Sequence, residues 1–325
     1  MPHLHWVLLG LGFFAILPLL SVKPLRAFNI PNHSFIIFGV GAVALVPLLF
    51  GAPLSINAII TLLVYLSFGF VCVCLGYHLV DKLGAEKLLA TISWFALASG
   101  LLVIFVALFS YFSGGLLGAQ WFVGGDDMTA HSGLSHRFIY ALTFATIALL
   151  YLYAKCNLPI TFFFILLVSL LSVLVFVGGA YVWIYPLTIT LLAIAMQVVA
   201  IKQRTGSTSI RSLVRVALLL LPLYFVLDGV IASLANNALE LPVMQATVVS
   251  SVMQFEGASV LLLLLLAGLG LWVYQYKAHQ FNIEAWFFAV VFLTLLISSI
   301  LNFPLAFGAY LGLIGFLLGV FQRKI

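Results

Sequence analysis

The sequence predicts an all-α polytopic membrane protein, and three observations lead to that prediction. The chain of 325 residues is 65% hydrophobic and only 6% charged, whereas soluble domains carry about 25% charged residues. Its apolar stretches can cross a hydrocarbon core about 30 Å thick, where only helices and closed barrels satisfy the backbone. Its basic residues also fall unevenly between alternate loops. The formal charge of +5 does not indicate nucleic-acid binding, because these charges form no exposed stripe.

Hydropathy predicts about eleven spans, which are named at the end of this paragraph. A break at Gly178 and Gly179 is needed, because the apolar stretch through them is too long for one crossing. The first span is expected to be retained, since Lys23 follows it and no cleavage site of small residues is evident. We expect residues 1–325 to form one transmembrane helical domain. The predicted spans are 6–22, 34–52, 56–78, 88–112, 137–154, 158–176, 179–200, 213–235, 256–275, 285–301 and 303–321.

The loops of this eleven-span arrangement separate the basic residues by side. When the loops are assigned alternately to the two sides, all thirteen basic residues except Arg137 fall on one side. The positive-inside rule therefore predicts an N-terminus outside and a cytoplasmic C-terminus. The residues assigned to the cytoplasm are Lys23, Arg26, Lys82, Lys87, Lys155, Lys202, Arg204, Arg211, Arg215, Lys277, Arg323 and Lys324.

Asp228 is the only acidic residue well inside a predicted span. The helix that carries it is expected to enter from the cytoplasm, so Asp228 should reach the outer leaflet. A carboxylate inside the membrane is costly, which makes Asp228 a candidate functional residue and a candidate catalytic base. The alternatives are a protonated side chain, or one hydrogen-bonded to Tyr224 or to a neighbouring helix.

The longest outer loop contains the polar sequence GGDDMTAHSGLSHR. Asp126, Asp127, His131 and His136 are metal-binding residue types, but their spacing matches no metal motif, so no metal is predicted. His136 and Arg137 are expected at the start of a helix, where the helix dipole favours anions. They are the predicted substrate-binding residues, and His136 is a second candidate base. A solvated loop without a ligand is the alternative.

Glu256 and the cysteines are weaker candidates. Glu256 opens a predicted helix, where its carboxylate either complements the dipole alone or also contributes to substrate binding. Cys72, Cys74 and Cys156 fit no disulfide framework or metal spacing and are interpreted as small apolar residues. Walker, dinucleotide-binding and zinc-protease motifs are missing from the sequence, and no cofactor is predicted.

The last predicted span carries a row of glycines on one helix face. Glycines at such spacing allow a neighbouring backbone to approach closely. This favours packing against another helix of the same chain, with a dimer face as the alternative. The glycines are Gly308, Gly312, Gly315 and Gly319.

Several segments together follow the order seen in one enzyme superfamily. Residues 298–305 read SSILNFPL before the glycine-spaced final helix, Glu256-Gly257 precedes a leucine-rich span, and GLSHRFIYALTFATIALLYLY occupies residues 133–153. This pattern resembles the bacterial O-antigen ligase and polymerase superfamily, especially its pilin and protein O-oligosaccharyltransferases. Members tend to read His-Ser-Leu-Leu-Glu-Tyr-Pro-Leu at the first of these segments, Glu-x-Gly at the second and Gly-x-x-Gln-Pro-Asn at the third.

The resemblance implies a bacterial inner membrane and glycan transfer from a polyprenyl-diphosphate carrier on the periplasmic side. Such transfer needs cations at the diphosphate and a base at the acceptor hydroxyl. This chain departs from the pattern both at the positions of the cations and at those of the candidate base. Residues 177–185 lack the arginine of the family's Ser-Arg motif, and the usual histidine falls near Thr247. Ser298 and Asn302 replace the histidine and glutamate of the C-terminal motif, so we expect ligase chemistry to be lost.

Four functions remain open from the sequence. The first is a degenerate ligase relative that binds a polyprenyl-diphosphate-linked glycan through His136, Arg137 and Glu256, or assists a transferase. The second is a non-catalytic accessory subunit that binds a membrane protein partner. The third is a transferase with Asp228 or His136 as base, and the fourth is a transporter, for which no inverted repeat is evident. Membrane lipids are expected partners, including anionic headgroups near the inner loop 201–212, and nucleic acid is not.

Overall fold

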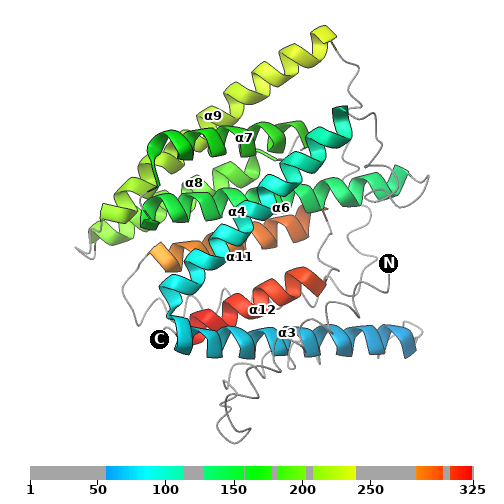
Figure 1. Cartoon of the computed structure of the whole chain (residues 1–325), viewed down its shortest axis with the longest axis vertical. Helices are drawn as coiled ribbons and strands as arrows, with labels where there is room; N and C mark the ends of the chain where they lie inside the picture. Colours follow the sequence, from blue (N-terminus) through cyan, green and yellow to red (C-terminus); the bar gives the residue numbers. More distant parts are fainter. Residues whose placement is uncertain are drawn as a thin grey trace, which may run out of the picture. The chain divides into compact units, whose positions relative to one another are not determined.

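The computed structural model describes residues 56–112, 128–156, 158–177, 182–202, 208–238, 283–302 and 308–323. These residues form helices and no strand, which confirms the all-α prediction for this part of the chain (Figure 1). Each helix overlaps one predicted span, whereas the spans predicted at 6–22, 34–52 and 256–275 lie outside the described residues. The helices are α3 (Ile56–Leu83), α4 (Ala85–Phe112), α6 (Met128–Cys156), α7 (Ile160–Val177), α8 (Ile184–Lys202), α9 (Thr208–Ala238), α11 (Ile283–Asn302) and α12 (Gly308–Arg323).

Length and apolar composition make several of these helices membrane spans. Four segments are long and apolar enough to cross a bilayer: Ala85–Phe105, Ile139–Cys156, Ile184–Lys202 and Thr208–Ser233. Two shorter apolar helices, Ile160–Phe176 and Ile283–Leu295, accompany them. By length and composition, the described helices are compatible with a helical membrane protein. The apolar stretch around Gly178 and Gly179 holds two separate helices, α7 and α8, as predicted.

A single glycine separates α3 from α4. Gly84 has a φ of +78°, a left-handed conformation that residues with a Cβ rarely adopt. Its backbone N–H donates to the Val80 carbonyl at 2.8 Å, which satisfies one of the free carbonyls at the end of α3. Lys82 lies in the last turn of α3 and Glu86 in the first turn of α4, where each charge complements the helix dipole.

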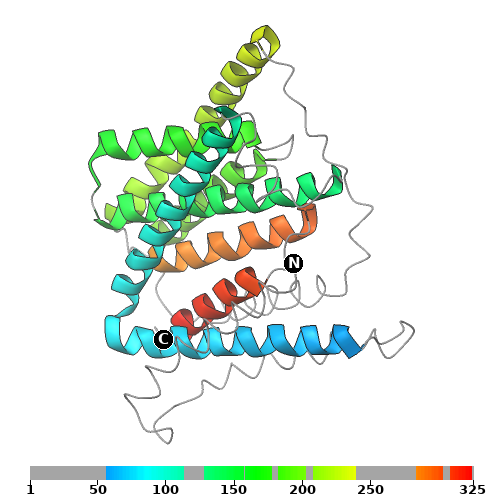
Figure 2. The ribbon, with the colours of Figure 1, turned by 45° about the vertical axis from the view of Figure 1, so that its right-hand side comes forward.

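The chain divides into two compact units. In the first unit, which takes in α3 and α12, the two helices lie side by side (Figures 1 and 2). A Cβ added at Gly315 would lie 2.5 Å from the Gly69 carbonyl oxygen, and one added at Gly319 would overlap the Val73 carbonyl oxygen. A Cβ at Gly312 would overlap the Phe68 ring. Gly312, Gly315 and Gly319 of α12 are therefore packed against α3 within the same chain.

The second unit takes in α4 from its second turn onward, together with α6, α7, α8, α9 and α11. Its core is α6, which contacts α7, α9 and α11. The ring of Phe287 on α11 lies 6.2 Å from Phe144 and 5.2 Å from Tyr151 of α6, between centroids, within the range of favourable aromatic pairs. Tyr153 of α6 contacts Phe163 of α7 at 4.4 Å. Aromatic side chains therefore join α6 to two of its neighbours.

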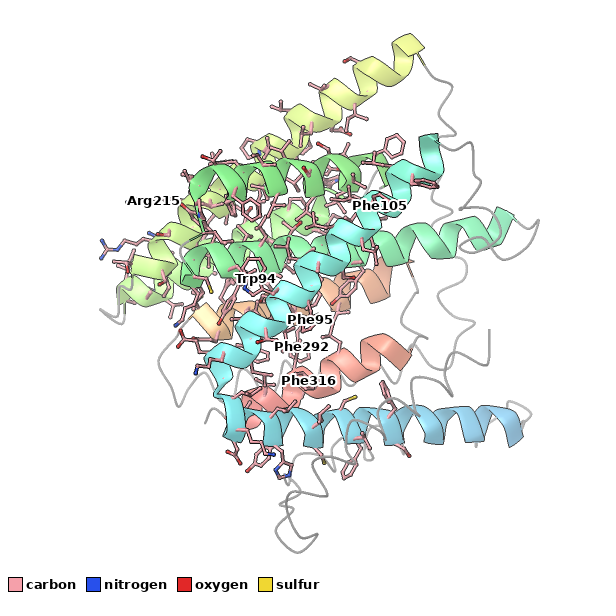
Figure 3. All side chains as sticks on the ribbon, in the orientation of Figure 1. Trp94, Phe95, Phe105, Arg215, Phe292 and Phe316 are labelled. Atoms are coloured by element: carbon pink, nitrogen blue, oxygen red, sulfur yellow. The ribbon has the colours of Figure 1, made fainter. Side chains whose placement is uncertain are left out.

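The outer surface of this unit is apolar. Trp94, Phe95 and Phe105 of α4 are exposed, whereas Phe292 of α11 is buried (Figure 3). Large exposed patches of this kind are unusual on a soluble monomer. They are expected where a helix faces lipid, since hydrocarbon solvates such side chains as well as a protein core does.

Candidate functional site

Asp228 lies in the second half of α9 and is exposed, as are Phe225, Val226 and Val230 around it. Tyr224, one turn earlier, is buried and interacts electrostatically with the Asp228 carboxylate. No ion pair joins Asp228 to another residue in the part of the chain that the structure describes. The carboxylate therefore faces outward from the second unit.

His136 and Arg137 lie in the third turn of α6, because this helix begins at Met128. The prediction that they start a helix is wrong for the described chain, since the preceding residues MTAHSGLS contain no proline and continue the helix upstream. The helix dipole acts mainly within the first turn, so it no longer supports anion binding at these two positions. Arg137 lies two residues before Ile139, and Ile139 and Tyr140 are the first residues of α6 that the structure describes as buried.

An ion pair that the sequence analysis missed joins α6 to α11. The Lys155 Nζ atom donates a hydrogen bond to Glu284 Oε1 at 3.3 Å. The Glu284 side chain is 7% exposed and that of Lys155 is 25% exposed. Lys155 lies in the last turn of α6 and Glu284 in the first turn of α11, so each charge also complements its own helix dipole.

The signal for this pair was present in the sequence. Lys155 and Glu284 are opposite charges at the ends of two predicted spans, and the loop count assigns both ends to the same side. What the sequence could not supply was the choice of partner. That choice depends on α11 packing beside α6, although Lys155 and Glu284 are far apart along the chain.

The remaining site candidates do not come together in the described chain. Asp126, Asp127, Thr247 and Glu256 lie outside the residues that the structure describes, while His131 lies in α6. Ser298 and Asn302 belong to α11. Within the described ranges no group of three or more histidine, cysteine, aspartate or glutamate residues could hold a metal ion. None of Cys72, Cys74 and Cys156 forms a disulfide.

No protein-family model, curated protein or solved structure matches this chain. The likeness to the ligase superfamily therefore stands as a hypothesis on the motifs quoted above. The described residues themselves offer three features: Arg137 on the N-terminal side of the packed segment of α6, the Lys155–Glu284 pair at the other end of that helix, and the exposed Asp228 of α9.

Proposed function

We propose that the protein spans a bacterial inner membrane eleven times, with its N-terminus outside and its C-terminus in the cytoplasm. In this proposal it is a degenerate relative of the O-antigen ligases. It binds a polyprenyl-diphosphate-linked glycan, or assists the transfer of that glycan, without catalysing the transfer itself. The observation that carries the proposal is the place of Arg137 on α6, the central helix of the second unit.

The Lys155–Glu284 pair supports the proposed topology. It requires the end of α6 and the start of α11 to lie on the same side of the membrane. Three helices, α7, α8 and α9, lie between these points in the sequence, and three crossings alone would leave Glu284 on the opposite side. A fourth crossing, which the proposal assigns to residues 256–275, brings Glu284 back to the side of Lys155.

The length of α6 supports an outer position for Arg137. Eighteen residues separate it from Lys155 on one continuous helix, which corresponds to about 27 Å along the axis. That distance is close to the thickness of the hydrocarbon core, about 30 Å. With Lys155 at the cytoplasmic surface, Arg137 therefore lies at the outer surface, where a polyprenyl-diphosphate headgroup would be. One guanidinium can bind a diphosphate by a bidentate contact, whereas transfer needs further cations and a base.

Lipid analysis of the purified protein tests this proposal. The wild type, Arg137→Ala and Lys82→Ala would be extracted in mild detergent, and the bound lipids identified by mass spectrometry. Lys82 is a matched control, because it is an exposed basic residue in the last turn of α3. We expect a polyprenyl-linked glycan with the wild type and the control, and a loss of about tenfold or more with Arg137→Ala. Recovery of no such lipid, or equal recovery from all three proteins, would contradict the proposal.

A second candidate function, that of a non-catalytic accessory subunit, is favoured by the exposed second half of α9. In an apolar stretch of 18 residues within Thr208–Ser233, only 22% of the residues are buried, and the exposed residues of this segment include Asp228. A subunit of this kind should be isolated together with a membrane protein in fixed stoichiometry. Native mass spectrometry in mild detergent would measure this, and a monodisperse monomer without a partner would count against it.

A further inference from the structure

The polar residues of α9 give the depth of Asp228 in the membrane. Arg215 near one end is exposed, and Asn236 lies near the other end. The two are separated along the helix axis by about 31 Å, which matches the hydrocarbon core of about 30 Å. Asp228 lies about 20 Å from Arg215 and about 12 Å from Asn236 along the same axis. It is therefore within the hydrocarbon, at a depth that its short side chain cannot bridge to either surface.

The surface around Asp228 is open and carries small residues. A Cβ added at Gly229 would have no heavy atom within 4 Å, and Ala232 and Ser233 are exposed. Gly229 and Ser233 are four residues apart and so lie on one face of the helix, beside Asp228. In Figures 1 and 2 this half of α9 extends beyond α7 and α8, which belong to the same unit.

This combination is typical of a helix that associates with another helix inside the membrane. Small residues at a spacing of four allow two backbones to approach closely, and a polar side chain strengthens the contact. An ionisable residue within a span almost always pairs with another polar group or faces water. The Asp228 side chain has no cationic partner among the described residues, so nothing in this part of the chain neutralises its carboxylate.

We propose that residues 222–233 of α9 dock a transmembrane helix of another protein, and that this helix carries a lysine or arginine at the depth of Asp228. The proposal rests on the accessory role described above and identifies the surface and the chemistry of the partner. The partner's cation neutralises the Asp228 carboxylate, and Gly229 and Ser233 set the close approach of the two backbones. Tyr224, one turn before Asp228, is buried within its own unit.

A second copy of this chain fits the surface less well. A symmetric contact through this face would bring two Asp228 carboxylates together, and one of them would then have to be protonated. The basic residues of the chain are predicted to lie in loops or at the ends of spans, so neither a second copy nor the predicted spans outside the described residues offer a cation at this depth. Charge complementarity therefore favours a different protein.

A synthetic peptide can replace the unidentified partner in the test. The full chain would carry a donor dye and be reconstituted in phosphatidylcholine vesicles. Two acceptor-labelled poly-leucine peptides would be compared, one with a single lysine eight residues from one end and one with leucine at that position. We expect the lysine peptide to associate about three- to tenfold more strongly, as measured by energy transfer against peptide-to-lipid ratio. Asp228→Leu should remove this preference, and Gly229→Leu should weaken binding by blocking close approach.

Leu218→Ala is the control, since it changes an exposed residue of the same helix far from Asp228 and should leave the preference intact. Equal binding of the two peptides, or a preference that survives Asp228→Leu, would overturn the proposal. Asp228-dependent energy transfer between donor- and acceptor-labelled copies without peptide would also overturn it, because a second copy would then cover this face. A preference for the lysine peptide without a bound polyprenyl-linked glycan would support the docking surface and contradict carrier binding. A bound glycan without a preference for the lysine peptide would support carrier binding and contradict the docking surface.

Discussion

Helices α6 and α9 belong to the same unit and are similar in length, yet they have opposite surroundings. Of the residues in the apolar segment Ile139–Cys156 of α6, 72% are buried, whereas only 22% are buried in an apolar stretch of 18 residues within Thr208–Ser233 of α9. In a water-soluble protein, a more buried helix is usually the more hydrophobic one. In a membrane, hydrophobicity cannot decide which helix is buried, because lipid is as apolar as a leucine side chain. Burial in this unit therefore reflects side-chain packing, which encloses most of Ile139–Cys156 and leaves the second half of α9 exposed among the described residues.

The largest expected effect comes from making the same substitution at a packed glycine and at an exposed glycine. A Cβ at Gly100 of α4 would overlap the Ala145 Cβ atom of α6, whereas Gly229 of α9 has open space. We expect Gly100→Leu to lower the free energy of unfolding by about 3 kcal/mol, because two packed backbones must separate. Gly229→Leu should be neutral or raise it by up to about 0.8 kcal/mol through helix propensity. Titration of the purified protein with SDS, followed by tryptophan fluorescence, would measure both, and equal losses would refute the contrast.

The second test compares two acidic residues. Glu284→Gln removes the carboxylate charge from the partly buried pair with Lys155. We expect a loss of about 2 kcal/mol, below the 3–5 kcal/mol typical of fully buried pairs, since Lys155 is 25% exposed. Asp228→Asn on α9 should change the free energy of unfolding of the isolated protein by less than about 0.5 kcal/mol.

A double-mutant cycle would assign the Glu284 effect to the pair itself. Lys155→Met combined with Glu284→Gln should cost less than the sum of the two single changes, because each single change leaves an uncompensated charge or a lost hydrogen bond. Strict additivity in the same SDS titration would show that the two side chains contribute separately.

These comparisons show what the sequence could predict and what it could not. Long apolar runs predict helices, and every described helix overlaps a predicted span because a bilayer enforces helical structure. The same runs cannot predict which helix is central, since α6 and α9 both satisfy the composition of a span. That property depends on specific side-chain contacts, such as Phe287 between Phe144 and Tyr151.

The candidate site was predictable to a smaller extent. Asp228 was identified from its isolation within an apolar span, a rule that needs no tertiary structure. Its exposure was not predictable. The helical period shows which residues share a face of α9, but it does not show which helix packs against that face. His136 and Arg137 were predicted at a helix start because the apolar stretch begins there. The helix α6 begins earlier, at Met128, in polar sequence that a hydropathy profile does not identify as part of a span.

A third test uses two leucines of equal size. Leu142 of α6 is fully buried and Leu218 of α9 is 48% exposed. Leu142→Ala should lower the free energy of unfolding by about 1–2 kcal/mol, since the transfer term is small in lipid and the cavity term remains. Leu218→Ala should change it by less than about 0.5 kcal/mol. Thermal denaturation in detergent micelles would rank the two variants, and a larger loss from Leu218→Ala would reverse the assignment of the two helices.

The smallest effect concerns the hydrogen bond that holds α9 to the rest of the unit. The Thr190 hydroxyl of α8 donates to the Pro186 carbonyl of its own helix or to the Ala217 carbonyl of α9, each at 2.8 Å. The Thr188 hydroxyl bonds only within α8, to the Ile184 carbonyl at 2.8 Å, so Thr188→Val is a matched control. Interhelical hydrogen bonds in membranes contribute about 0.6 kcal/mol on average, and we expect Thr190→Val to cost about that much more than Thr188→Val. Hydrogen exchange in α9 would show whether the added loss is local. Faster exchange in α9 with Thr190→Val alone would support a stabilising role of the interhelical hydrogen bond. Identical exchange in both variants would mean that packing alone holds the first half of α9 in place.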